Sequence, residues 1–72
     1  MRRERVINKL RELGYGFKRN AWRVAIFRNP RTMHVIQVRN KDDISDDWVR
    51  QALRQAGVPS EEIERFIRDC VN

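Results

Sequence analysis

The sequence lacks the covalent cross-links that stabilise many very small proteins. Its 72 residues include one cysteine, Cys70, so no disulfide can form within the chain. The absence of a cysteine framework is typical of proteins in a reducing compartment, and we expect a cytoplasmic location. No histidine or lysine stands next to Cys70 to activate its thiol. We therefore interpret this residue as a small hydrophobe on the inner side of a helix.

Long apolar runs and metal-ligand clusters are also missing. The longest apolar run begins at Val24 and is far shorter than the about 18 residues that cross a membrane. The start at Met1 has charge but no apolar segment behind it, so we predict no signal peptide and no membrane partner. His34 is the only histidine, which leaves no Cys/His set for zinc. No glycine-rich phosphate loop occurs, and we predict no cofactor and no metal.

Positive charge is concentrated in the first part of the chain. Residues 1–41 hold 12 Lys and Arg against 2 Asp and Glu, a net charge of +10, whereas residues 42–72 hold 4 against 8, a net charge of −4. Thirteen of the 16 basic residues are arginine, which binds phosphate through two parallel hydrogen bonds and stacks on bases. The usual reason to gather such charge on one stretch is a polyanionic partner, most often nucleic acid.

The spacing of apolar residues predicts three strands between helices. Apolar residues at helical spacing indicate a helix over residues 2–13, closed by Gly14. Aromatic and β-branched residues then alternate over residues 15–19, 22–28 and 33–39, which is typical of three strands. The connections between them are short, so we expect hairpins and an antiparallel meander.

The second part of the chain reads as two further helices. Ser45 and Gly57 are predicted to cap the two ends of the first, and Ser60 the start of the second. The order α-β-β-β-α-α predicts one α+β domain over residues 1–72. We expect a two-layer sandwich with a three-stranded antiparallel sheet and helices on one face. The residues predicted to face inward from the last helix are Ile63, Phe66, Ile67 and Cys70.

Several segments together resemble the HicA toxin family over about residues 4–67. They are the helix-Gly-aromatic start, Arg19, Phe27-Arg28-Asn29-Pro30, Asp43-Ile44, and the run from Val49 to Val58 that contains Gln55-Ala56-Gly57. The resemblance implies a fold like that of double-stranded-RNA-binding domains and cleavage of messenger RNA. It also implies a HicB-like antitoxin as a partner.

The catalytic position of that family is changed in this chain. The family's catalytic residue is a histidine in a Gly-Ser-His stretch of the second strand, and alignment places the histidine at Val24 and the glycine at Trp22. Valine cannot transfer a proton, so the family's acid/base group is missing. The sequence leaves enzymatic activity open. His34 is a weak candidate for a relocated catalytic residue, acting with Arg28 or Arg39.

These observations predict a small basic RNA-binding domain with weak or no ribonuclease activity. Trp22 has two interpretations, a base-stacking platform or a core residue that shares its strand face with Val24 and Ile26, and we favour the core. Trp48 is also predicted to lie in the core. The residues predicted to contact nucleic acid are Arg2, Arg3, Arg5, Lys9, Lys18, Arg19, Trp22, Arg23 and Arg28.

Five other interpretations stay open at this stage. The chain can be a protein-interaction module that binds an acidic, antitoxin-like partner, or an active messenger-RNA interferase with a relocated histidine. The basic stretch alone does not distinguish RNA from DNA, and it can also be a solvated surface without a ligand. The acidic cluster offers oxygen ligands for Mg²⁺, but helix capping explains two of its members and we favour that structural role. The cluster consists of Asp42, Asp43, Asp46 and Asp47.

Overall fold

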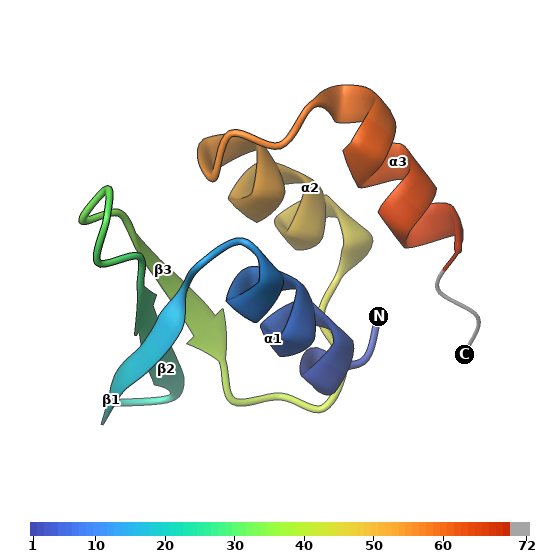
Figure 1. Cartoon of the computed structure of the whole chain (residues 1–72). Coiled ribbons are helices and arrows are strands. Elements are labelled where there is room, and N and C mark those ends of the chain that lie inside the picture. The colour runs from blue at the N-terminus through green and yellow to red at the C-terminus, as the bar shows by residue number, and fades with distance from the viewer. Residues whose placement is uncertain (70–72) are drawn as a thin grey trace.

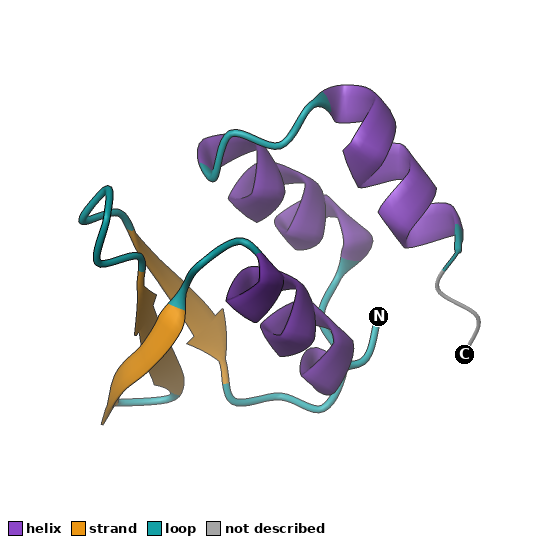
Figure 2. Ribbon diagram, in the orientation of Figure 1, coloured by secondary structure: helices purple, strands orange, loops and turns teal. Residues whose placement is uncertain are grey.

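The computed structural model describes residues 1–69, and it confirms the predicted α+β layout (Figure 1). The three strands form one antiparallel sheet in the order β1-β2-β3, and the helices lie on one side of it (Figure 2). Cys70, predicted to face inward, lies outside the described residues. The elements are α1 (Arg3–Glu12), β1 (Gly16–Ala21), β2 (Val24–Arg28), β3 (Val35–Arg39), α2 (Asp46–Gln55) and α3 (Ser60–Arg68).

The first helix ends at the predicted glycine and covers the sheet. Val6 and Leu10 lie one turn apart on α1 and are buried in the core. Gly14 adopts a φ of +96°, a left-handed conformation that residues with a Cβ rarely take. This turn lets the N–H of Tyr15 donate to the carbonyl of Leu10 over 2.9 Å, which satisfies a carbonyl at the helix end.

The hairpin between β1 and β2 differs from the prediction. Its second strand begins at Val24, because Trp22 and Arg23 form the turn that reverses the chain. Ala21 and Val24 face each other across this two-residue turn. Trp22 was predicted to begin a strand, and the structure places it at the hairpin tip instead. β1 contains no buried residue and carries a bulge between Phe17 and Arg19.

The face of β2 that points to the helices is the opposite of the one predicted. Val24 and Ile26 were expected to face inward, but Ala25 and Phe27 do so. These two residues pair with Val38 and Ile36 of β3, and all four belong to the core cluster. Side chains directly opposite each other in an antiparallel pair share a face. Val24 and Ile26 therefore lie on the outer face of the sheet.

The last two helices follow the predicted pattern except at one cap. Ser45 caps α2, because its Oγ accepts a hydrogen bond of 3.2 Å from the N–H of Trp48. Gly57, with a φ of +89°, follows α2 as predicted. Ser60 does not cap α3. It is the first residue of that helix, and Pro59 holds the capping position without a side-chain hydrogen bond.

The third helix packs on the other helices and lies away from the sheet (Figure 1). Ile63 of α3 is buried, and Phe66 and Ile67 are half-buried against the core, as predicted. Trp48 of α2 was predicted to be a core residue. It packs against the core but remains half-exposed. Part of its indole therefore stays available to solvent.

The loop between β3 and α2 is fixed by the first residues of the chain. The amino group of Met1 donates to the carbonyl of Ile44 over 2.9 Å, and the N–H of Ile44 donates to the carbonyl of Met1 over 2.7 Å. The N–H of Arg3 donates to the carbonyl of Asp42 over 2.9 Å. Segments about 40 positions apart thus hold each other, and the loop has a defined path.

Candidate nucleic-acid interface

The outer face of the sheet carries three arginines and no acidic residue. Its centre is Ile26, which is only 7% exposed although no helix covers this side. The long side chains of the flanking residues must account for that burial, since arginine can lay its apolar stem over a hydrophobic neighbour. The register places on this face Gly16, Arg28 and Val35, then Arg19, Ile26 and Gln37, then Ala21, Val24 and Arg39.

The tip of the first hairpin extends this basic face. Trp22 is 81% exposed, so the predicted core position of this residue is wrong. The guanidinium carbon of Arg23 lies 4.2 Å from the centre of the indole ring, within the range of a cation–π contact. Arg23 also has a φ of 63°, which is strained for a residue with a Cβ. An exposed indole with a cation stacked on it is suited to stacking with bases.

The strained backbone at Arg23 predicts that one substitution weakens binding without lowering stability. Arg23→Gly should leave the free energy of unfolding unchanged or raise it by about 1 kcal/mol, because relief of the roughly 1–2 kcal/mol left-handed penalty outweighs the entropy cost of glycine. Any affinity of the hairpin tip for RNA should fall about three- to tenfold, since one cation is lost. Urea unfolding and fluorescence anisotropy measure the two effects.

Arg31→Gly provides the matched control. Arg31 is exposed in the turn between β2 and β3 and does not have a positive φ. This substitution should lower the free energy of unfolding by about 0.5–1 kcal/mol, the ordinary cost of glycine. If Arg23→Gly destabilises the protein as much as Arg31→Gly does, the backbone at Arg23 is not strained in solution.

The basic residues of α1 do not join the outer face of the sheet. Arg5 and Lys9 lie over the ring of Phe66 in α3, at 5.3 and 5.4 Å from its centre. Arg3 reaches the end of β3, where its Nε donates to the carbonyl of Arg39 over 3.0 Å. Of the predicted contact residues, the structure places Arg19 and Arg28 on the outer face, Trp22 and Arg23 at the hairpin tip, and Lys18 at the adjacent bulge. The other four lie on the helical side: Arg2, Arg3, Arg5 and Lys9.

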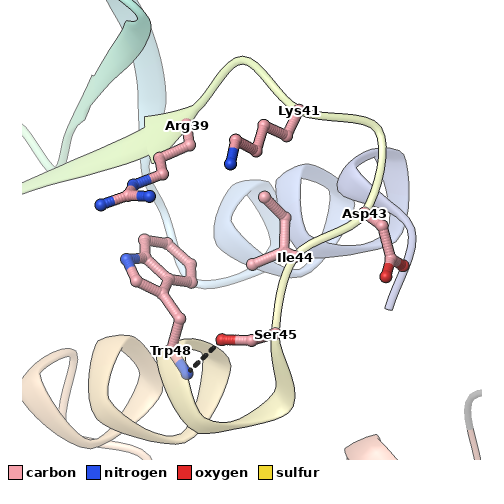
Figure 3. Close-up of a pocket in the computed structure, with 6 residues that line it drawn as sticks. All are labelled: Arg39, Lys41, Asp43, Ile44, Ser45 and Trp48. Atoms are coloured by element: carbon pink, nitrogen blue, oxygen red, sulfur yellow. Dashed lines mark hydrogen bonds between the residues drawn. The ribbon is translucent and has the colours of Figure 1, made fainter.

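A pocket opens at the end of β3, beside the start of α2 (Figure 3). Its volume is about 330 Å³. Arg39 and Lys41 line it together with the indole of Trp48, and the carboxylate of Asp43 points away from them. Sequence reasoning did not assign Lys41 or Trp48 to a site. The sequence carries only a weak signal for this pocket, because residue spacing does not show that the loop between β3 and α2 folds back over the start of α2.

The lone histidine faces the core side of the sheet and not the arginines. Nδ1 of His34 and the hydroxyl of Tyr15 share a hydrogen bond of 2.6 Å, and the two rings meet edge to face with centres 5.8 Å apart. Arg28 and Arg39 lie on the outer face. The sheet thus separates the imidazole from both arginines, the partners that a relocated catalytic histidine was expected to use.

Burial raises the pKa of the Tyr15 hydroxyl above its ordinary value of 10.0. The folded protein therefore favours the protonated phenol. This contribution to stability is complete below pH 10 and is lost as the pH rises through the raised pKa. We expect the free energy of unfolding to fall above pH 10, and Tyr15→Phe to remove that part of the pH dependence.

The ionisation of Tyr15 can be followed directly. Tyr15 is the only tyrosine, so the near-ultraviolet absorbance of phenolate reports this residue alone. The folded protein should titrate at higher pH than the same chain in urea. Coincident titration curves for the folded and unfolded chains would contradict the buried, hydrogen-bonded phenol.

The acidic part of the chain pairs with its own arginines on the helical side. Arg50 donates to Oε2 of Glu64 over 2.9 Å and to Oδ1 of Asp47 over 3.0 Å. The hydrogen bond from Arg50 lowers the pKa of Glu64, and the same contact raises the pKa of Arg50. This network links α2 to α3. It keeps these carboxylates away from the basic face of the sheet.

Among residues 1–69, no three acidic, histidine or cysteine side chains are arranged to hold a metal ion. The aspartates of the acidic cluster have other contacts: Asp43 and Asp46 lie 3.2 and 3.8 Å from the amino group of Met1. No helix within the described residues is both long and apolar enough to span a membrane. Comparisons with models of protein families, with curated proteins and with solved structures found no match to this chain.

Proposed function

We propose that this protein is a cytoplasmic RNA-binding domain that contacts phosphates with the outer face of its sheet. The observation that supports this most is the set of three arginines, Arg19, Arg28 and Arg39, on a face without a carboxylate. Arginine forms short, charge-assisted hydrogen bonds to phosphate, often two at once. Trp22 and Arg23 at the hairpin tip add a surface on which bases can stack.

The resemblance to HicA toxins supports RNA over DNA. The resemblance implies action on messenger RNA, so RNA is the nucleic acid that it favours as the ligand. A protein that reads ribose hydroxyls should bind an RNA duplex more tightly than a DNA duplex of equal length. Competition between the two duplexes for one labelled RNA distinguishes these partners.

A salt titration tests the proposal directly. Five cations lie on the outer face, the hairpin tip and the adjacent bulge, fewer than the sequence indicated because those of α1 lie on the helical side. If each neutralises one phosphate, log Kd plotted against log salt concentration should have a slope of roughly 3 to 5. A slope near zero in an anisotropy titration would show that phosphates are not the ligand.

We further propose that the domain binds RNA without cutting it. Val24, at the position of the family's catalytic histidine, lies on the outer face of the sheet and has no proton to exchange. His34, the remaining candidate, is bonded to Tyr15 on the other side. Intact RNA after long incubation with the purified protein is the expected result. Cleavage that disappears in His34→Ala would identify an interferase with a relocated histidine.

An acidic, HicB-like protein is a second candidate partner for the same face. Val35 is 42% exposed beside Arg28, so the face combines cations with apolar surface, as protein interfaces do. Such a partner should compete with RNA for the arginines. Formation of a complex on size exclusion, together with release of bound RNA, would support this function.

A further inference from the structure

We infer that the pocket between β3 and α2 holds one unpaired nucleotide of the bound RNA. Its phosphate would lie between Arg39 and Lys41, and its base would lie against Trp48. This inference rests on the proposed function, because it requires an RNA on the outer face of the sheet. It adds a preference of the protein for a duplex that ends in an unpaired nucleotide.

The lining of the pocket has the chemistry of a nucleotide site. Arg39 and Lys41 are exposed, and neither forms a salt bridge with any residue between 1 and 69. Two free cations next to a partly exposed indole match the two parts of a nucleotide, the phosphate and the flat base. The volume of about 330 Å³ is at the small end of ligand sites, which run from about 300 to 1,000 Å³, so one nucleotide fits better than two.

The pocket is built before any ligand arrives. Arg3 holds its wall, because its Nε donates to the carbonyl of Arg39 and its Nη2 donates to Oδ1 of Asn40, both over 3.0 Å. Ile44 on the lining is bonded to Met1 through both its N–H and its carbonyl. A loop fixed in this way loses little freedom when it binds, which favours affinity.

The acidic residues near the pocket do not leave it negative. Asp43 turns away from the cations (Figure 3). It lies 3.2 Å from the amino group of Met1, which also lies 3.8 Å from Asp46. Asp47 is paired with Arg50 over 3.0 Å. Of the charged residues that line the pocket, Asp43 lies next to a cation, so the charges of Arg39 and Lys41 determine the local potential.

The pocket lies at the same end of the sheet as the exposed hairpin tip. Arg39 is the strand partner of Val24, and the N–H of Asn40 donates to the carbonyl of Arg23 over 3.0 Å. An RNA strand that follows the arginines along the outer face reaches this end next. There Arg39 belongs both to the face and to the pocket. A strand end that leaves the duplex can therefore enter the pocket without breaking a phosphate contact.

The first test compares a blunt RNA duplex with the same duplex carrying one unpaired 3′ nucleotide, both by anisotropy. The wild-type protein should bind the second about tenfold more tightly, in line with one stacked base. Lys41→Ala and Trp48→Leu should each reduce this preference to less than twofold while keeping most of the affinity for the blunt duplex. Lys41 is exposed in a loop, so its variant should fold even if the Trp48 variant does not.

Arg31→Ala is the control of equal charge change at the opposite end of the sheet. It should keep the tenfold preference. If the wild-type protein binds both duplexes equally, with a steep salt dependence, the nucleotide pocket is wrong and the proposed function stands. If neither duplex binds in a salt-dependent way, the proposed function fails and the inference fails with it.

The second test separates an RNA end from a free nucleotide. Uridine 5′-monophosphate, uridine and inorganic phosphate are titrated separately while the indole N–H signals of Trp48 and Trp22 are followed by NMR. The monophosphate should shift the Trp48 signal at millimolar concentration, at least tenfold lower than uridine needs, and Lys41→Ala should abolish the difference. Equal responses to uridine and its monophosphate would overturn the phosphate position. If the monophosphate shifts the Trp48 signal but the protein binds the overhanging and blunt duplexes equally, the occupant of the pocket is not an RNA end.

Discussion

Replacement of Arg19, Arg28 and Arg39 together by glutamine is expected to weaken RNA binding on the order of a hundredfold at about 0.1 M salt. The three arginines share the outer face of the sheet. In the proposed complex each would form a charge-assisted contact to phosphate that glutamine cannot replace. The slope of log Kd against log salt concentration should also fall by about 2 to 3, because fewer counterions are released. Anisotropy titrations at several salt concentrations measure both quantities.

A second triple variant separates position from net charge. Arg11, Arg54 and Arg65 are exposed and belong to the helices, and their replacement by glutamine removes the same charge. This control should change RNA affinity about threefold or less, because charges on the far side are largely screened at this salt concentration. Equal losses in the two triple variants would contradict a binding face on the sheet. Circular dichroism checks that both proteins are folded.

Leu10→Ala should cost about 3–5 kcal/mol of the free energy of unfolding. Leu10 is 0% exposed between α1 and the sheet, so the substitution leaves a cavity that its neighbours cannot fill. A domain of this size is stable by about 4–11 kcal/mol in total, so this loss is a large fraction of its stability. The melting temperature should fall by about 15 °C or more. Urea and thermal unfolding followed by circular dichroism measure the loss.

Leu13→Ala is the same chemical change on a half-buried residue just after the same helix. It should cost about 1 kcal/mol, since less apolar surface leaves the core and no closed cavity forms. Helix propensity contributes little to either variant, because leucine lies close to alanine on that scale. If Leu10→Ala costs no more than Leu13→Ala, the packing between α1 and the sheet is not the main source of stability.

Most of the fold could be predicted because its signals are local. The helices follow from apolar spacing with Ser45, Gly14 and Gly57 at their ends, which act within a few residues. The faces of β3 also follow from a local signal, because Gln37 marks the outer side of this strand. The face of β2 was predicted wrongly. The residues from Val24 to Phe27 are all apolar, so alternation carries no mark of inside and outside.

The candidate site was predicted only where one strand or turn carries it. Charge along the chain indicated the arginines of the hairpin. The exposure of Trp22 was missed because the turn was predicted between residues 19 and 22, and it lies at Trp22 and Arg23. The pocket was not predictable, because its parts meet through the contact of Met1 and Arg3 with the loop before α2. Arg5 and Lys9 lie away from the site because they contact Phe66, and this contact likewise depends on the packing of α3 against α1.

β1, the strand without a buried residue, can open alone. Its connections to the rest of the protein include the hydrogen bonds to β2 and an edge-to-face contact of Phe17 with Phe27. Such a strand has few apolar contacts to lose, so it separates at a lower free energy than the core beneath it. The hairpin tip can therefore change its conformation around a ligand while the helices remain folded. Binding at Trp22 would then decrease local opening, and adaptability at this tip costs the domain little of its global stability.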